Sequence, residues 1–83
     1  MKRGYITIIS AVLEASLEEV IKTAIMRYAN LDSRQFETYS EFLQERHLLE
    51  KINDNNTRYK TTKKGHLFLK DVYSIKNLLT KEK

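Results

Sequence analysis

The chain has 83 residues, with 15 Lys and Arg residues against 11 Asp and Glu residues and a formal net charge of +4. A chain of this length sustains one hydrophobic core, so we expect a single domain over residues 1–83. The composition, 41% hydrophobic and 31% charged, is typical of a globular protein, and no apolar run approaches the ~20 residues that cross a bilayer. A disordered chain is therefore excluded, and no membrane partner is expected.

The residue types that most often carry catalysis are scarce. There are no cysteines, which excludes disulfides, thiolate metal sites and cysteine nucleophiles and favours an intracellular, cytoplasmic protein. His47 and His66 lie 19 positions apart without a convincing third ligand, so we expect no metal site and no cofactor. No nucleophile elbow, glycine-rich phosphate loop or H-E-x-x-H motif is present, which argues against an enzyme and against a small-molecule substrate. The apolar stretch after the basic start ends at Glu14 without a cleavage site, so no signal peptide is expected.

Charge is distributed unevenly along the chain. Residues 30–50 hold two basic and five acidic residues, whereas residues 51–83 hold nine basic and three acidic residues. A basic C-terminal third indicates attraction to a polyanion, and nucleic acid is the commonest such partner. A lysine-rich surface that only keeps the protein soluble explains the same pattern equally well.

Two helices are predicted in the first part of the chain. The first covers about residues 4–15, because apolar residues recur there at helical spacing. These residues are Ile6, Ile8, Ile9, Val12 and Leu13. Ser16 and Glu19 have the S-x-x-E form of a capping box, which predicts a second helix that begins at Leu17 and ends at Asn30. Its expected buried stripe is Leu17, Val20, Ile21, Ala24, Ile25 and Tyr28.

A third helix is expected after a short break. Asp32 or Ser33 can cap its start, and it should run to about His47. Its apolar residues are Phe36, Tyr39, Phe42 and Leu43. The break before it is only three residues long, as in a helix-turn-helix motif.

A β-hairpin and a fourth helix follow. Residues 48–52 form a short apolar strand, residues 53–57 are rich in turn formers, and residues 58–61 alternate like a returning strand. Thr62 can cap a last helix over residues 63–80. Three helices, a two-stranded hairpin and a C-terminal helix make an α+β winged helix-turn-helix, in which the third helix can enter a major groove.

Several segments resemble the small basic winged-helix DNA-binding proteins of crenarchaea, a family of chromatin-associated proteins and transcriptional regulators. The residues that carry the resemblance are 6–15, 23–31, Tyr39, Leu43, Leu48-Leu49 and Tyr59-x-x-Thr62-x-Lys64-Gly65. The resemblance implies double-stranded DNA as the ligand, a nucleoid-associated location and a homodimer held by antiparallel C-terminal helices. The sequence departs from the family at Gln35, Ser40, Thr61 and His47. Phe36 and Phe42 are expected to restore the core volume that these departures remove.

Two surfaces are candidates for DNA contact. On the third helix, Ser33, Arg34 and Thr38 lie near the N-terminus, where a helix favours phosphate and Arg can bridge guanine acceptors. The acidic residues Glu37, Glu41 and Glu45 favour instead a plain solvated face. On the hairpin, the expected phosphate contacts are Asn55, Asn56, Thr57, Arg58, Lys60, Lys63 and Lys64. Arg58 and Lys60 alternate with an inward Tyr59, although lysines can also serve only to protect a sheet edge.

The last helix, residues 63–80, is the candidate dimerisation element. Phe68, Val72, Ile75 and Leu79 are spaced as an a/d seam with Leu78 adjacent, and Leu67 and Leu69 are expected to face the helix's own domain. A monomer would leave the end of this seam exposed to water. The alternative is that the whole helix folds back on its own subunit. The rival function is a protein-interaction adaptor, because an acidic third helix suits a basic protein partner better than DNA.

Overall fold

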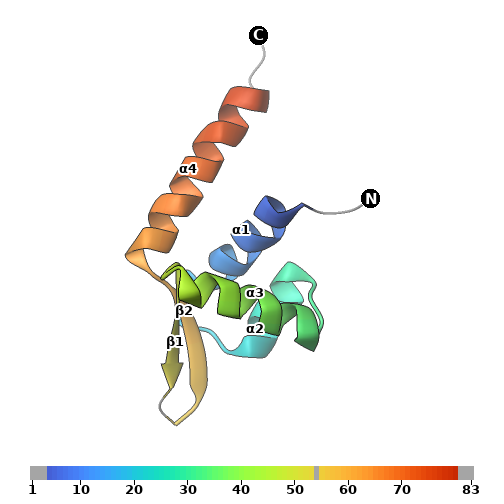
Figure 1. Cartoon of the computed structure of the whole chain (residues 1–83), viewed down its shortest axis with the longest axis vertical. Helices are drawn as coiled ribbons and strands as arrows, with labels where there is room; N and C mark the ends of the chain where they lie inside the picture. Colours follow the sequence, from blue (N-terminus) through green and yellow to red (C-terminus); the bar gives the residue numbers. More distant parts are fainter. Residues whose placement is uncertain (1–3, 54, 81–83) are drawn as a thin grey trace.

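A computed structural model of the chain describes residues 4–53 and 55–80. The elements are α1 (Tyr5–Ala15), α2 (Lys22–Ala29), α3 (Ser33–Glu45), β1 (Leu49–Asn53), β2 (Thr57–Thr61) and α4 (Lys63–Thr80). The hairpin and α4 leave the body of α1, α2 and α3 in opposite directions (Figure 1), which gives the molecule extents of 51 × 29 × 19 Å. This arrangement confirms the predicted winged helix-turn-helix. The basic start at residues 1–3 and the turn residue Asp54 lie outside the described residues.

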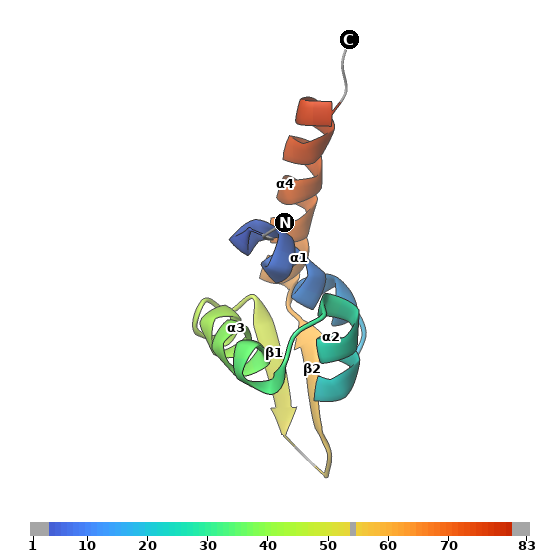
Figure 2. The same ribbon diagram turned by 90° about the vertical axis from the view of Figure 1, so that its right-hand side faces the viewer.

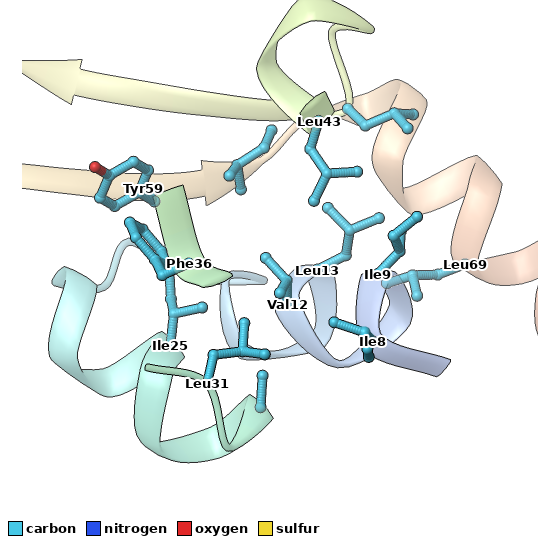
Figure 3. Close-up of a cluster of buried hydrophobic side chains, with 13 residues drawn as sticks. Ile8, Ile9, Val12, Leu13, Ile25, Leu31, Phe36, Leu43, Tyr59 and Leu69 are labelled. Atoms are coloured by element: carbon cyan, nitrogen blue, oxygen red, sulfur yellow. The ribbon is translucent and has the colours of Figure 1, made fainter. Parts of the chain in front are cut away.

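The core forms where α1, α2, α3 and the hairpin meet. Val12 and Leu13 of α1 are completely buried, and so are Ile25 of α2 and Leu43 of α3. Figure 3 shows these side chains gathered around α1, with Leu69 of α4 closing one end. Each fully buried aliphatic side chain contributes about 1.5–3 kcal/mol through removal of apolar surface from water. The predicted stripe of α1 is therefore correct except at Ile6, which is 50% exposed.

The predicted start of the second helix is wrong. Helix α2 begins at Lys22 instead of Leu17, and the Ser16 hydroxyl donates to the carbonyl of Val12 (2.8 Å) instead of capping a new helix. Val20 pairs with Tyr59 of β2 through two backbone hydrogen bonds of 3.0 and 2.8 Å. Backbone groups on the outer edge of β2 need partners, and the segment 16–21 supplies them, which outweighs the local capping signal.

The expected buried stripe of the second helix is correspondingly only half right. Ile25 is buried, but Leu17, Ile21 and Tyr28 are 40%, 52% and 60% exposed. Leu17 and Ile21 belong to the non-helical segment 16–21, so the helical spacing of 3.6 residues per turn, which predicted that they share one face, does not apply to them.

Helix α3 begins and ends with residues whose local chemistry suits those places. Asn30 closes α2 in the left-handed conformation (φ 57°, ψ 56°), as predicted. Asp32 is the cap of α3: its carboxylate accepts from the Gln35 N–H (2.8 Å), and the Gln35 side chain accepts from the Asp32 N–H (3.0 Å). The helix ends at Glu45, earlier than expected, and His47 then takes a positive φ of 62°.

Only one of the two phenylalanines of α3 restores core volume. Phe36 is 1% exposed, whereas Phe42 is 37% exposed and lies beneath the Arg46 guanidinium, 3.8 Å from its ring centroid. The expectation for Phe42 is therefore wrong. At 100° per residue its position is far from that of Phe36, so it faces solvent and is covered in part by a neighbouring cation.

The junction between the hairpin and α4 leaves no room for a side chain at Gly65. Thr62 caps α4 by accepting from the Gly65 N–H (3.0 Å), and its hydroxyl donates to the His47 carbonyl (2.6 Å). A Cβ at Gly65 would clash with the Leu48 carbonyl oxygen and lie 2.5 Å from Thr61 Cγ2. Helix α4 therefore packs directly on the hairpin backbone.

Gly65→Ala should destabilise the fold by about 1–3 kcal/mol, because the added methyl group meets backbone that cannot move without shifting β1. Urea unfolding followed by circular dichroism would measure the loss. Gly4→Ala is the matched control, since a Cβ at Gly4 has no neighbour within 4 Å, and we expect it to cost less than about 1 kcal/mol. Equal stability of the two variants would contradict the packing described for α4.

One carboxylate connects three helices. Glu14 of α1 accepts a hydrogen bond from the Tyr28 hydroxyl of α2 at Oε1 (3.1 Å) and from the Tyr73 hydroxyl of α4 at Oε2 (2.5 Å). We call these residues the Glu14 cluster. Their hydrogen bonds to the Glu14 carboxylate raise the pKa of both phenols, that of Tyr73 from 10.0 to about 12, because ionisation would place a phenolate beside a carboxylate.

Because the pKa of Tyr73 is raised in the folded state, the free energy of unfolding should change with pH in the alkaline range. The folded pKa lies above the unfolded one, so the contribution is complete below pH 10.0 and is lost as pH rises through about 12. We expect the free energy of unfolding of the wild type to fall more steeply over this interval than that of Tyr73→Phe. Urea unfolding at a series of pH values measures both slopes. Identical slopes would mean that Tyr73 does not donate to Glu14.

Candidate nucleic-acid interface

The exposed face of α3 changes character along the helix. Ser33, Arg34 and Thr38 are exposed in its first half, as predicted, and the Thr38 hydroxyl donates back to the Arg34 carbonyl (3.1 Å). Glu41 and Glu45 are exposed in its second half. The N-terminal half of α3 therefore offers Arg34, backbone N–H dipoles and hydroxyl groups to a phosphate or a base edge, and it also carries the exposed carboxylate of Glu37.

The register of the hairpin sorts its side chains onto two sides. Leu49 pairs with Thr61, Lys51 with Tyr59 and Asn53 with Thr57, while Glu50 pairs with Lys60 and Ile52 with Arg58. Directly opposed residues share a face, and successive residues alternate between faces. The Tyr59 ring contacts Phe36 of α3 edge-on, 5.2 Å between centroids, so the side that carries Lys51 and Tyr59 is turned toward α3. We call it the inner side and the opposite side the outer side.

The two predicted cations of β2, Arg58 and Lys60, lie on the outer side. Arg58 Nη1 is 2.6 Å from Glu19 Oε1, and Lys60 borders a hollow with Glu18 and Glu19. Lys60 also lies across the strands from Glu50. Acidic groups thus offset the positive charge of the outer side, which the sequence alone presented as a basic strip.

Two lysines that sequence analysis did not select lie on the side of α3. Lys51 is exposed on the inner side of the hairpin, opposite Tyr59. Lys22, the first residue of α2, has its Nζ 5.7 Å from the Phe36 ring centroid and 3.9 Å from Glu37 Oε2. The parity of Lys51 with Tyr59 was available from the sequence, whereas Lys22 could be placed only with the correct start of α2.

The remaining predicted DNA-contact residues of the hairpin lie in two places, at its tip and near its base. Asn55, Asn56 and Thr57 are exposed at the tip, where the Thr57 hydroxyl donates to the Asn53 side chain (3.1 Å). Lys63 and Lys64 are exposed beyond the other end of β2, a strand that spans about 13 Å from Thr57 to Thr61 at ~3.3 Å per residue. In Figure 2 the hairpin reaches past both α2 and α3, so its tip projects from the body. The structure therefore does not bring Lys63 and Lys64 to the tip.

An apolar groove of about 520 Å³ runs between the start of α1 and α4. It is lined by Ile6, Thr7, Phe68, Asp71, Val72, Ile75, Lys76 and Leu79. Val72 is 7% exposed, but Ile75 is 57% exposed and Leu78 and Leu79 are each 77% exposed. Leu69 faces its own domain as predicted, whereas Leu67 is 57% exposed, which corrects that expectation. The second half of α4 thus carries aliphatic surface that its own subunit does not cover.

Other kinds of site find no support in the part of the chain that the structure describes. Within residues 4–53 and 55–80, no three His, Cys, Asp or Glu side chains are grouped so that they could hold a metal ion. Over the same residues, none of the helices has the length and hydropathy needed to span a bilayer. The surfaces that stand out are the face of α3 with the hairpin and the groove beside α4.

The chain belongs to the winged helix-turn-helix family, whose model matches residues 2–80. Its structure is similar to that of Sso10a-2, a DNA-binding protein from Sulfolobus solfataricus, with 20% identity, a TM-score of 0.75 and coverage of 98% of this chain and 100% of that one. It is also similar to F-93 of SSV1, with 16% identity, a TM-score of 0.66 and coverage of 94% of this chain and 97% of that one. These matches confirm the resemblance to crenarchaeal winged-helix proteins.

The same fold occurs in a larger regulator. A MarR family transcriptional regulator from Silicibacter pomeroyi matches with 10% identity and a TM-score of 0.67, over 88% of this chain and 52% of the regulator. At sequence identities of 10–20%, these structural similarities show a shared fold. No curated protein sequence matches the chain at a significant level.

Proposed function

We propose that the protein binds double-stranded DNA as a homodimer and acts as a transcriptional regulator or a chromatin-organising protein on the nucleoid. The observation that carries this proposal is that Lys22 and Lys51 lie on the side of α2 and the hairpin that faces α3, whose exposed N-terminal half carries Arg34 next to Glu37. The structural similarity to Sso10a-2, a DNA-binding protein, supports it. Residues 1–83 then form one domain, with α4 as its dimerisation helix. Neither a catalytic step nor a cofactor is needed.

In this proposal α3 approaches the major groove by its N-terminal end. Ser33 and the first N–H groups of the helix meet phosphate, and Arg34 and Thr38 reach base edges. Glu41 and Glu45 repel phosphates, so the C-terminal half of α3 stays away from the backbone. The hairpin tip, Asn55, Asn56 and Thr57, follows the adjacent minor groove through hydrogen bonds.

The cations differ in how directly they contribute. Lys22 and Lys51 neutralise phosphates beside α3. Lys22 is available for this contact because its ion pair with Glu37 is long and exposed and therefore weak. Arg58 can bind phosphate only by leaving Glu19, to which it is joined at 2.6 Å. Arg58, Lys60, Lys63 and Lys64 therefore add mainly to the long-range positive potential that attracts DNA.

The dimer covers the apolar surface of α4. Ile75, Leu78 and Leu79 are more than half exposed in one subunit, beside a groove that continues onto Ile6. A second α4 laid along this groove buries the seam of Phe68, Val72, Ile75 and Leu79 in both subunits at once. The dimer also presents two hairpins to one duplex, which raises affinity through a high effective concentration.

A protein-interaction adaptor is the second candidate function. The exposed pair Glu41 and Glu45 on α3 favours it, because an acidic helix face suits a basic protein surface. The same fold serves either role, so binding to duplex DNA decides between them. An adaptor would not shift random duplex at low salt, whereas a DNA-binding protein would.

Affinity for random duplex should fall steeply with salt. Six cations from two subunits (Lys22, Arg34 and Lys51 in each) predict a slope of log affinity against log salt of about −5. In Lys22→Ala/Lys51→Ala four of these cations are lost, so the slope should flatten to about −2. Electrophoretic mobility shifts or fluorescence anisotropy over a salt series measure both slopes.

Arg58→Ala/Lys60→Ala is the matched control, since it removes the same charge from the outer side of the hairpin. We expect it to weaken binding a few-fold while the slope stays near −5. If the slope flattened more in this control than in Lys22→Ala/Lys51→Ala, the outer side of the hairpin would be the side that contacts DNA. No binding of duplex by the wild type at low salt would overturn the proposed function.

Ile75→Glu/Leu79→Glu should convert the dimer into a monomer, because four carboxylates would have to be buried in the seam. Sedimentation velocity or light scattering measures the mass. Ser74→Glu/Asn77→Glu adds the same charge on a polar face of α4 and should leave the mass unchanged. A wild-type chain that remains monomeric at high micromolar concentration would contradict the dimer.

A further inference from the structure

We propose that Glu14 is a positioning residue that fixes the direction in which α4 leaves the body, and that it thereby sets the distance between the two hairpins of the dimer. The consequence for the dimer rests on the proposed function, but the positioning itself is a property of one subunit. The proposal concerns the Glu14 cluster of Glu14, Tyr28 and Tyr73.

The cluster lies near the point along α4 at which its side chains cease to be buried. Val72 is the last residue of α4 that is buried among the described residues, and Ile75 is already 57% exposed. Tyr73 lies between them and is 44% exposed, so its hydroxyl contact with Glu14 is an outer point of attachment of α4. Figure 1 shows that the C-terminal part of α4 extends away from α2, α3 and the hairpin.

Glu14 holds α2 and α4 together through its two carboxylate oxygens, and we call this pair of hydrogen bonds the clamp. One Glu14 oxygen accepts from Tyr73 at 2.5 Å, and the other accepts from Tyr28 of α2 at 3.1 Å. Because both carboxylate oxygens accept hydrogen bonds, the Glu14 side chain is held in one orientation with respect to α2. The hydrogen bond from Tyr73 then fixes the position of α4 relative to α2.

When the Glu14 contact is lost, a small rotation of α4 about its start becomes a large displacement near its end. The helix rises about 1.5 Å per residue, so Asn77 lies about 21 Å from its start, and a tilt of about 10° moves it by about 4 Å. In a symmetric dimer both subunits tilt, which adds the displacements between the two hairpins. The clamp therefore determines which spacing of DNA contacts the dimer fits.

Paired spin labels test the clamp within one chain. The protein has no cysteine, so Thr23→Cys on α2 and Asn77→Cys on α4 provide two unique labelling sites. Labelled chains are diluted with an excess of unlabelled protein, and the distance distribution is measured by pulsed dipolar spectroscopy. We expect Tyr73→Phe and Glu14→Ala to shift or broaden this distribution by about 4 Å, the displacement derived for a tilt of about 10°.

The controls separate the clamp from a general loss of structure. Tyr5→Phe also removes one phenol oxygen, but from a 72% exposed residue whose ring contacts Tyr39, and it should leave the distribution unchanged. The double variant Glu14→Ala/Tyr73→Phe should equal Glu14→Ala, because both changes remove the same contact. A distribution in Tyr73→Phe that is identical to the wild type would overturn the proposal.

A second label pair tests the consequence for the dimer. With the single label Asn55→Cys at each hairpin tip, Tyr73→Phe should broaden the distance between the two subunits. An unchanged distance between subunits, together with a changed distance within the chain, would overturn the proposed role in spacing. Absence of any dipolar signal between subunits in the wild type would contradict the homodimer, while the measurement within one chain would still decide whether Glu14 positions α4.

Discussion

Tyr59 is the residue at which the hairpin, α3 and the segment after α1 meet. Its ring packs edge-on against Phe36, its N–H and carbonyl pair with Val20, and it is 6% exposed. An aromatic pair of this kind contributes about 0.5–1.5 kcal/mol beyond the area it buries, and two satisfied backbone groups avoid the cost of burial without partners. The direction of the hairpin relative to α3, and therefore the shape of the candidate DNA surface, depends on this residue.

The same contact decides which side chains can act together. Because Tyr59 must face α3, its neighbours Arg58 and Lys60 must face away from it, where Glu19 and Glu50 lie. Lys51, directly opposite Tyr59, must then lie on the α3 side. A basic stretch in the sequence is thus divided between an inner side that carries Lys51 and an outer side on which acidic residues offset Arg58 and Lys60. Alternation along the strands indicates which residues share a side, and the three-dimensional structure adds the acidic partners of the outer side.

Local signals predicted the elements that local chemistry determines. The left-handed Asn30, the inward Tyr59 and the cap at Thr62 each depend on a few adjacent residues, and the sequence identified all three. For the cap of α3 it left Asp32 and Ser33 as alternatives, and the structure selects Asp32. The segment 16–21 was misassigned because its capping box is a genuine local preference that loses to a long-range demand, the open edge of β2. The Glu14 cluster joins residues 59 positions apart, so no periodicity could indicate it.

The acidic half of α3 is compatible with DNA binding once the position of the hairpin is considered. A helix that lay lengthwise in the major groove would bring Glu41 and Glu45 near phosphates, at a cost that grows as water is excluded. The hairpin reaches past α3 (Figure 2). In the proposed complex, contact at its tip would hold the body away from a duplex and admit the N-terminal end of α3 first. The carboxylates would then oppose deeper entry and restrict the protein to one docking angle. In such an arrangement the cations supply affinity and the acids supply orientation, because a repulsive group excludes wrong geometries as effectively as an attractive group favours the right one.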